Sequence, residues 1–124
     1  MSVAYDAAFG DWVREHFVAL GPLQIKPMFG GASVYADGLI FALLDDGVVW
    51  MKADDTNAPA LIAAGARQFS FPTKDGQTMT MAYWSLPDSA VDDPDEAVAW
   101  ARRSMEVAAR KAAAKPPRKP KVKP

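Results

Sequence analysis

The sequence predicts an α+β fold in two layers, in which an antiparallel sheet of about five to six strands is flanked by N-terminal and C-terminal helices. Apolar residues recur at three- and four-residue steps at both ends of the chain, as in amphipathic helices. The middle of the chain instead holds short apolar runs separated by a Gly-Gly pair and two Asp-Gly pairs, a pattern typical of hairpins. With 124 residues, half of them hydrophobic, the chain is long enough to bury one core.

The first expected element is an amphipathic helix over residues 4–20. One face of this helix carries Tyr5, Phe9, Trp12, Val13, His16, Phe17 and Leu20. Gly21-Pro22 ends it, because glycine adopts the left-handed conformation of a helix terminus and proline cannot continue a helix. His16 is the only histidine of the chain, and its place on the apolar face predicts a packed side chain rather than a catalytic base.

Six short strands are expected next, over residues 25–29, 32–36, 39–45, 48–52, 69–71 and 79–84. Pro27 lacks an amide donor and favours an edge position for the first strand. Alternate residues of a strand point to opposite faces of the sheet. In the third strand both sets are apolar, so both of its faces are apolar: one face carries Leu39, Phe41 and Leu43, and the other carries Ile40, Ala42 and Leu44. Both faces therefore need cover, which helices can supply on one side and a second subunit on the other.

Two further helices complete the predicted domain. A short helix around Leu61-Ile62 follows Asp54-Asp55-Thr56, whose side chains can cap it. The last helix starts at Pro94, with Asp93 as its cap and Glu96 in a capping-box position, and its inner face holds Val98, Ala101, Met105, Ala108 and Ala112. Four prolines exclude a helix from Lys115 onward. We therefore expect a domain of residues 1–109 and a basic, Pro/Lys-rich disordered tail of residues 110–124.

The net charge of −1 conceals two oppositely charged parts. Residues 1–109 carry seven Lys and Arg against fifteen Asp and Glu, a net charge of −8, whereas residues 110–124 carry seven cations and no acid, a net charge of +7. A flexible cationic tail suits contact with phosphate groups irrespective of base sequence. The residues expected to bind nucleic acid are Arg110, Lys111, Lys115, Arg118, Lys119, Lys121 and Lys123. The tail could equally bind an acidic protein surface or fold back on its own acidic domain.

A series of short motifs occurs in order along residues 5–109. They are Met28-Phe29-Gly30-Gly31, Val34-Tyr35, Gly38, Phe41-Ala42-Leu43, Trp50-Met51-Lys52, Asp54, Gly65, Phe69, Met81-Ala82-Tyr83-Trp84, Pro87, Asp92-Asp93-Pro94 and Trp100-Ala101. Together they resemble the N-terminal domain of the TfoX/Sxy family of competence regulators. The resemblance implies a two-layer fold related in shape to secretion chaperones, and a regulatory role in competence or transcription. Full-length TfoX-like proteins carry a second helical domain after this one, and here the basic tail is expected in its place.

Catalytic and metal sites find little support in the sequence. There is no cysteine, which excludes thiolate nucleophiles and thiolate metal sites. Gly30-Gly31 lies between two strands, whereas a phosphate-binding P-loop precedes a helix. The acidic doublets Asp45-Asp46, Asp54-Asp55 and Asp92-Asp93 lack the spacing of a calcium loop and suit turns and helix starts. We therefore expect no enzyme activity, no cofactor and no metal.

The sequence favours a non-catalytic regulatory module that contacts a protein partner, with the tail adding affinity for nucleic acid. The alternative is a homodimeric, chaperone-like adaptor without a nucleic-acid role, because the third strand and the aromatic-rich sheet are hard to cover within one subunit. Base stacking on Tyr35, Trp50, Tyr83 or Trp84 is less favoured than packing, since Lys52 is the only nearby cation in the sequence. No signal peptide or membrane span is predicted, so we expect a cytoplasmic location.

Overall fold

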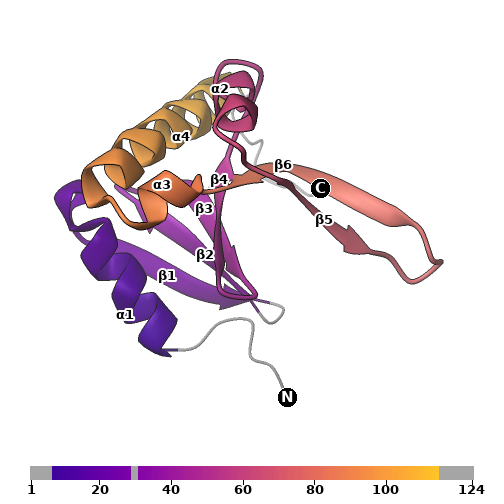
Figure 1. Ribbon diagram of the computed structural model, residues 1–124, viewed down its shortest axis with the longest axis horizontal. Coiled ribbons are helices and arrows are strands. Elements are labelled where there is room, and N and C mark those ends of the chain that lie inside the picture. The colour runs from indigo at the N-terminus through magenta and orange to yellow at the C-terminus, as the bar shows by residue number, and fades with distance from the viewer. Residues whose placement is uncertain (1–6, 29–30, 115–124) are drawn as a thin grey trace, which may run out of the picture.

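The computed structural model describes residues 7–28 and 31–114 and contains a six-stranded antiparallel sheet with helices along one face (Figure 1). The strands are β1 (Leu23–Met28), β2 (Gly31–Ala36), β3 (Leu39–Asp45), β4 (Val48–Lys52), β5 (Gln68–Pro72) and β6 (Thr78–Ser85). The helices are α1 (Ala7–His16), α2 (Ala58–Ala63), α3 (Asp88–Val91) and α4 (Pro94–Ala114), and a 3₁₀ turn, η1, covers Val18–Leu20. The strand order is β1-β2-β3-β4-β6-β5, and every neighbouring pair is antiparallel. The predicted α+β fold is confirmed.

The Asp-Gly pairs form the two hairpin turns predicted for them. Asp37 and Gly38, between β2 and β3, have φ angles of 55° and 78°, and Asp46 and Gly47, between β3 and β4, have φ angles of 53° and 74°. Two consecutive residues with positive φ make a turn whose twist matches that of the flanking strands. These four residues therefore place β2, β3 and β4 side by side.

The start of α4 follows the predicted cap in part. Asp93 Oδ1 accepts hydrogen bonds from the amides of Asp95 and Glu96 at 3.0 and 3.3 Å, so the aspartate caps the helix. The Glu96 carboxylate points elsewhere, because its Oε2 accepts hydrogen bonds from Ser89 Oγ at 2.8 Å and from Trp100 Nε1 at 3.1 Å. Glu96 thus joins α3 to α4 instead of completing a capping box.

The N-terminal helix is shorter than predicted and is anchored through its histidine. Residues 4–6 lie outside the described residues, α1 ends at His16, and the chain then tightens into η1. His16 is buried; its ring stacks on Trp12 at 4.4 Å, and its Nε2 lies 2.8 Å from the carbonyl oxygen of Ala90 in α3, a helix that the sequence did not predict. The packing role expected for His16 is confirmed, and the residue ties α1 to α3.

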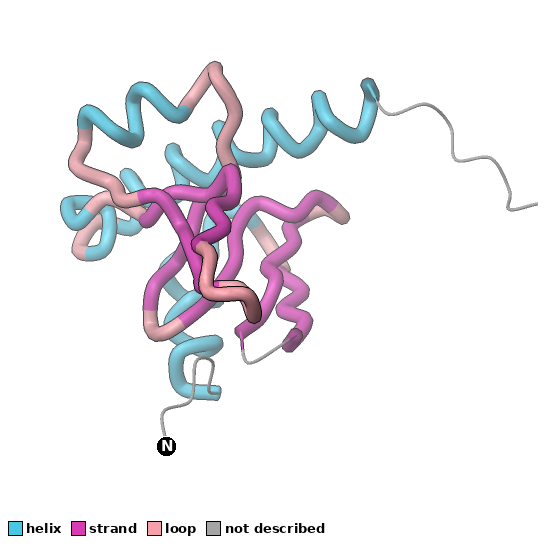
Figure 2. Tube along the Cα trace, turned by 90° about the vertical axis from the view of Figure 1, so that its right-hand side faces the viewer, coloured by secondary structure: helices cyan, strands magenta, loops and turns pink. Residues whose placement is uncertain are grey.

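The main core lies between the sheet and the helix layer. Its buried residues are Val13, Phe17, Leu23, Ala32, Val34, Ala36, Phe41, Ala42, Leu44, Val49, Met51, Leu86, Ala90, Ala97, Val98 and Ala101. α4 contributes mainly small side chains, which let its backbone approach β3 and β4 closely. In Figure 2 α4 crosses the sheet and extends beyond it towards its C-terminal end.

The simple alternation predicted for β3 is wrong at Phe41. The β2–β3 register runs from Val34 opposite Ala42 to Tyr35 opposite Ile40, so Phe41 is an extra residue in a β-bulge. Because of this insertion, Phe41 lies with Ala42 in the helix-covered core and is completely buried. The bulge therefore leaves the opposite face of β3 to Ile40 and Leu43.

Candidate interaction surface

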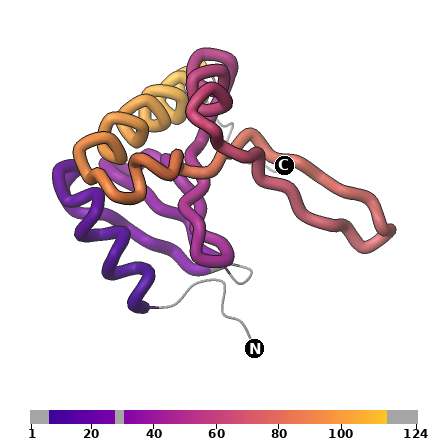
Figure 3. Tube along the Cα trace, viewed as in Figure 1, coloured from indigo at the N-terminus to yellow at the C-terminus, as the bar shows by residue number. Residues whose placement is uncertain are grey.

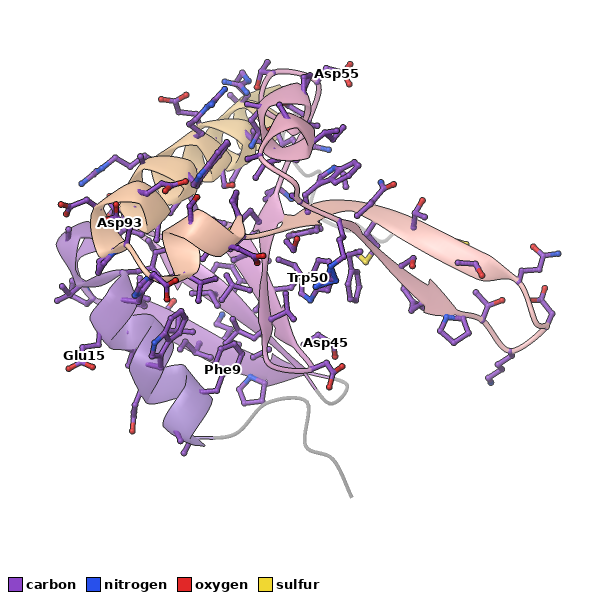
Figure 4. The ribbon with its side chains drawn as sticks, in the orientation of Figure 1. Phe9, Glu15, Asp45, Trp50, Asp55 and Asp93 are labelled. Carbon is purple, nitrogen blue, oxygen red and sulfur yellow. The ribbon has the colours of Figure 1, made fainter. Side chains whose placement is uncertain are left out.

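The sheet face opposite the helix layer carries a second apolar cluster. Its buried members are Leu43, Trp50 and Tyr83, and the partly buried residues packed against them are Ile40, Val48 and Phe69. Leu43 lies opposite Trp50 in the β3–β4 ladder, so this cluster crosses several strands. Figure 4 shows Trp50 on the side of β4 away from Phe9 of α1. We call this side the open face of the sheet.

A hairpin projects from the open face beyond the rest of the sheet, as Figure 3 shows. This β5–β6 arm comprises residues 68–82. The ladder between β4 and β6 covers only Ser85, Trp84 and Tyr83 of β6, so the rest of β6 runs past the end of β4. An isolated two-stranded hairpin is marginally stable in water. The arm therefore depends on its base at Tyr83 and on whatever packs against its apolar side.

The apolar side of the arm carries three large hydrophobic residues that are exposed to solvent. Phe71, Met79 and Met81 have exposed fractions of 38%, 51% and 38%, and Phe71 pairs with Met79 across the hairpin. The only charged residues between positions 68 and 87 are Lys74 and Asp75, close to the turn of the arm. The arm is thus a mainly apolar element without net charge, on a domain that is otherwise strongly acidic.

An apolar groove of about 490 Å³ lies between the arm and the sheet. It is lined by Gly31, Ala32, Ser33, Ile40, Leu43, Leu44, Asp45, Phe69, Phe71, Met81 and Tyr83. The ring of Phe69 packs between two other aromatic rings, with its centroid 4.9 Å from that of Trp50 in β4 and 6.0 Å from that of Phe71 in β5. Partial burial and the neighbouring Asp46 carboxylate raise the pKa of Asp45 at the end of the groove. The groove and arm suit an apolar protein segment.

A group of cations borders the open face where the sheet meets the end of α4. The Lys26 Nζ lies 4.9 Å from the centroid of the Tyr35 ring, and the Lys52 Nζ lies 5.1 Å from that of Tyr83. Tyr35, Lys52 and Lys111 line one hollow of about 550 Å³, together with Ala114. We call Lys26, Tyr35, Lys52 and Lys111 the cationic corner.

The two tyrosines of this region differ in exposure. Tyr83 is buried, and burial, assisted by the nearby Tyr35, raises the pKa of Tyr83 to about 12. Its hydroxyl therefore stays protonated at neutral pH, and its oxygen accepts a hydrogen bond from Lys52 Nζ at 3.4 Å. Tyr35 is only partly buried. Packing is thus the role of Tyr83 and of the buried Trp50, as predicted, whereas Tyr35 keeps part of its surface exposed.

The seven cations predicted to bind nucleic acid divide into two groups. Residues 110–114, expected at the start of the tail, are the last residues of α4, and Arg110 and Lys111 lie there. Arg110 Nη2 forms an ion pair with Asp54 Oδ2 at 3.2 Å and donates to Thr56 Oγ1 at 2.7 Å, whereas Lys111 is exposed. The other predicted residues are outside the described part of the chain: Lys115, Arg118, Lys119, Lys121 and Lys123.

A comparison with known families finds a match over most of the chain. The TfoX N-terminal domain family matches residues 15–108, well over half of the 124-residue chain. The chain belongs to the TfoX N-terminal domain family. This family is not known as an enzyme family. No curated protein matches the chain.

A third hollow of this chain is lined in part by titratable side chains. This hollow, of about 520 Å³, lies beside α1 and α3, and its lining includes Arg67, Asp88, Asp92 and Ser85. Among the residues that the structure describes, no histidine or lysine lines it to activate the serine. Within residues 7–28 and 31–114, no group of three or more His, Asp or Glu side chains could hold a metal ion. Among the described helices, none has the length and apolar character needed to cross a bilayer.

Proposed function

We propose that this member of the TfoX N-terminal domain family is a non-catalytic cytoplasmic module for competence- or transcription-type regulation, which acts by binding a protein partner. The exposed apolar side of the β5–β6 arm, next to the apolar groove, is the observation that carries the proposal. Burying apolar surface contributes about 25 cal/mol per Å². Side chains such as Phe71, Met79 and Met81 are therefore suited to bind a protein and poorly suited to remain in water.

The second part of the proposal is that the basic tail adds affinity for nucleic acid. Its support is the charge distribution, since residues 110–124 carry seven cations and no acid. Each phosphate contact on duplex DNA adds a slope of about −0.9 to the dependence of log affinity on log salt, so seven contacts give at most about −6. The ion pair of Arg110 with Asp54 competes with one of these contacts.

A salt titration of DNA binding tests the tail. The full chain is compared with a full-length variant in which Lys115, Arg118, Lys119, Lys121 and Lys123 are replaced by glutamine. We expect the wild type to bind duplex and single-stranded DNA with a steep negative salt slope, and the variant to lose most of the affinity and of the slope. Equal binding by the two proteins would refute the role of the tail.

The alternative function is a homodimeric adaptor without a nucleic-acid role, and the open edge of β6 favours it. If two copies pair β6 to β6 around a two-fold axis at Thr80, Met79 lies opposite Met81 of the second copy. Two acidic domains also repel each other least where their surfaces carry no net charge, as along the arm.

Sedimentation equilibrium of the full chain tests this alternative. Met79→Lys and Met81→Lys should each weaken a dimer of this kind, since they add like charges to the shared face. Val18→Lys is the matched control, because Val18 is 68% exposed and belongs to η1, away from the arm. A wild-type chain that stays monomeric at high concentration would exclude the homodimer and leave a different protein as the partner of the arm.

A further inference from the structure

We propose that the cationic corner is a binding site for single-stranded nucleic acid within the folded domain. The inference rests on the proposed nucleic-acid role of the tail and goes beyond it, because it assigns part of the binding to the residues Lys26, Tyr35, Lys52 and Lys111. Three positively charged side chains and one partly buried aromatic ring from β1, β2, β4 and α4 come together there.

The charge of the corner is opposite to that of the domain around it. Lys26 and Lys111 are exposed, so their ammonium groups can reach a bound phosphate chain. Lys52 is partly buried and held against Tyr83, and it adds its positive charge from that position. The carboxylates that are nearest along the chain are Asp37, in the turn beside β2, Asp54 and Asp55 after β4, and Glu106 in α4. Asp54 is paired with Arg110. An acidic protein of net charge −8 over residues 1–109 therefore presents a local cationic site.

Tyr35 supplies the aromatic surface that distinguishes single strands from duplexes. Its ring is partly buried, and Lys26 Nζ lies over it at 4.9 Å. A base stacked on an aromatic ring stabilises a complex more than an exposed lysine over the same ring does. The flexible Lys26 side chain can therefore move to a phosphate while a base takes its place on the ring. Paired bases in a duplex cannot make this contact.

The position of the corner also joins it to the basic tail. Ala114, the last described residue of α4, lines the same hollow as Tyr35, Lys52 and Lys111, and the next residue in the sequence is Lys115. The α4 end of the corner therefore leads directly, in the sequence, into the five cations of residues 115–124. The sequence marks Tyr35 as a candidate for base stacking, but it does not show that Lys26 and Lys111 lie near this ring, because the sheet and α4 bring these residues together only in the fold.

Fluorescence anisotropy with labelled oligo-dT, oligo-U and a DNA duplex tests the site in the full-length protein over a range of salt concentrations. We expect Lys26→Gln and Lys111→Gln each to reduce the magnitude of the single-strand salt slope by about 0.7. Lys74→Gln, which changes the net charge equally at the far end of the arm, should leave the slope unchanged. Tyr35→Leu should weaken binding of the single strands by about fivefold to a hundredfold, while Tyr35→Phe retains it.

The outcomes separate the corner from the tail. If the tail variant loses binding while Lys26→Gln, Lys111→Gln and Tyr35→Leu bind oligo-dT like the wild type, the corner is refuted and the proposed function stands. If the wild type binds none of the three probes at low salt, the corner site and the nucleic-acid role of the tail are both refuted. Equal losses in Tyr35→Leu and Tyr35→Phe would also overturn the stacking role. A circular dichroism melt of each variant verifies that it is folded under the binding conditions.

Discussion

Asn57 is a completely buried polar residue whose replacement tests how the strand that carries Lys52 is held. Its Oδ1 accepts a hydrogen bond from the amide of Asp54 at 2.9 Å, and its Nδ2 donates to the carbonyl oxygen of Lys52 at 3.1 Å. The same carbonyl accepts a second hydrogen bond, from Ser104 Oγ of α4, at 2.7 Å. Asn57 and Ser104 have exposed fractions of 1% and 0%. The end of β4 is therefore fastened to the start of α2 and to α4 at one point.

The hydrogen bonds predict different costs for the two alanine variants. Asn57→Ala removes two part-buried hydrogen bonds at about 0.5–1.5 kcal/mol each and leaves the Asp54 amide without its acceptor, so the free energy of unfolding should fall by about 2–3 kcal/mol. Ser104→Ala removes one hydrogen bond, and Asn57 still satisfies the Lys52 carbonyl. Its cost should be about 1 kcal/mol.

Asn57→Asp adds a signature in pH that a loss of packing would not produce. The new carboxylate keeps an acceptor for the Asp54 amide but faces the Lys52 carbonyl, and both the burial and this contact favour its protonated form. Its pKa in the folded state should therefore lie above the unfolded value of about 3.9. The destabilisation is absent below that value, grows as the pH rises from it, and is complete above the folded pKa.

Urea unfolding followed by tryptophan fluorescence between about pH 3 and pH 7 measures these differences against the wild type at each pH. Asn57→Ala has no titrating group at this position and serves as the control for the rest of the protein. The reasoning fails if Asn57→Ala costs less than Ser104→Ala, or if the deficit of Asn57→Asp relative to Asn57→Ala does not change with pH.

Two further predictions concern Gly31 and Asp54. A Cβ on Gly31 would collide with the backbone carbonyl oxygen of Leu44, so Gly31→Ala should lower the free energy of unfolding by about 1–3 kcal/mol in the same urea assay; an unchanged midpoint would contradict the close approach of β2 and β3. Hydrogen bonds from Thr56, and then the Arg110 guanidinium, hold the pKa of Asp54 below its usual value. This stability is present above about pH 4 and is lost as the pH falls through the folded pKa, so Asp54→Asn should flatten the acid side of the stability profile. If the stability of Asp54→Asn falls with acid as steeply as that of the wild type, the ionised Asp54 does not contribute in this way.

Short-range signals in the sequence were enough for most of the fold. The Asp-Gly turns could be predicted because a two-residue hairpin requires positive φ at both positions, which only a few residues tolerate. The cap at Asp93 and the packed His16 could be predicted from their spacing to apolar residues. These features depend on residues within a few positions of one another, so the local sequence is sufficient to specify them.

The interaction surface depended on information that the local sequence lacks. The bulge at Phe41 arises from the β2–β3 register and moves a side chain that simple alternation puts on the other face. The arm projects because β4 ends before β6 does, and this follows from comparing two strands about thirty residues apart. Neither the bulge nor the projecting arm can therefore be predicted from the residues of a single strand.

By itself, the sequence determined the α+β class, the family, the hairpin turns, the lack of thiolate chemistry and the concentration of basic residues after position 109. Only the tertiary structure decided which aromatic rings are buried, where Phe71, Met79 and Met81 are exposed, and that Lys26, Lys52 and Lys111 surround Tyr35. The physical reason is that composition and turn propensity act over a few residues, whereas burial and charge clustering depend on which distant segments the strand register brings together.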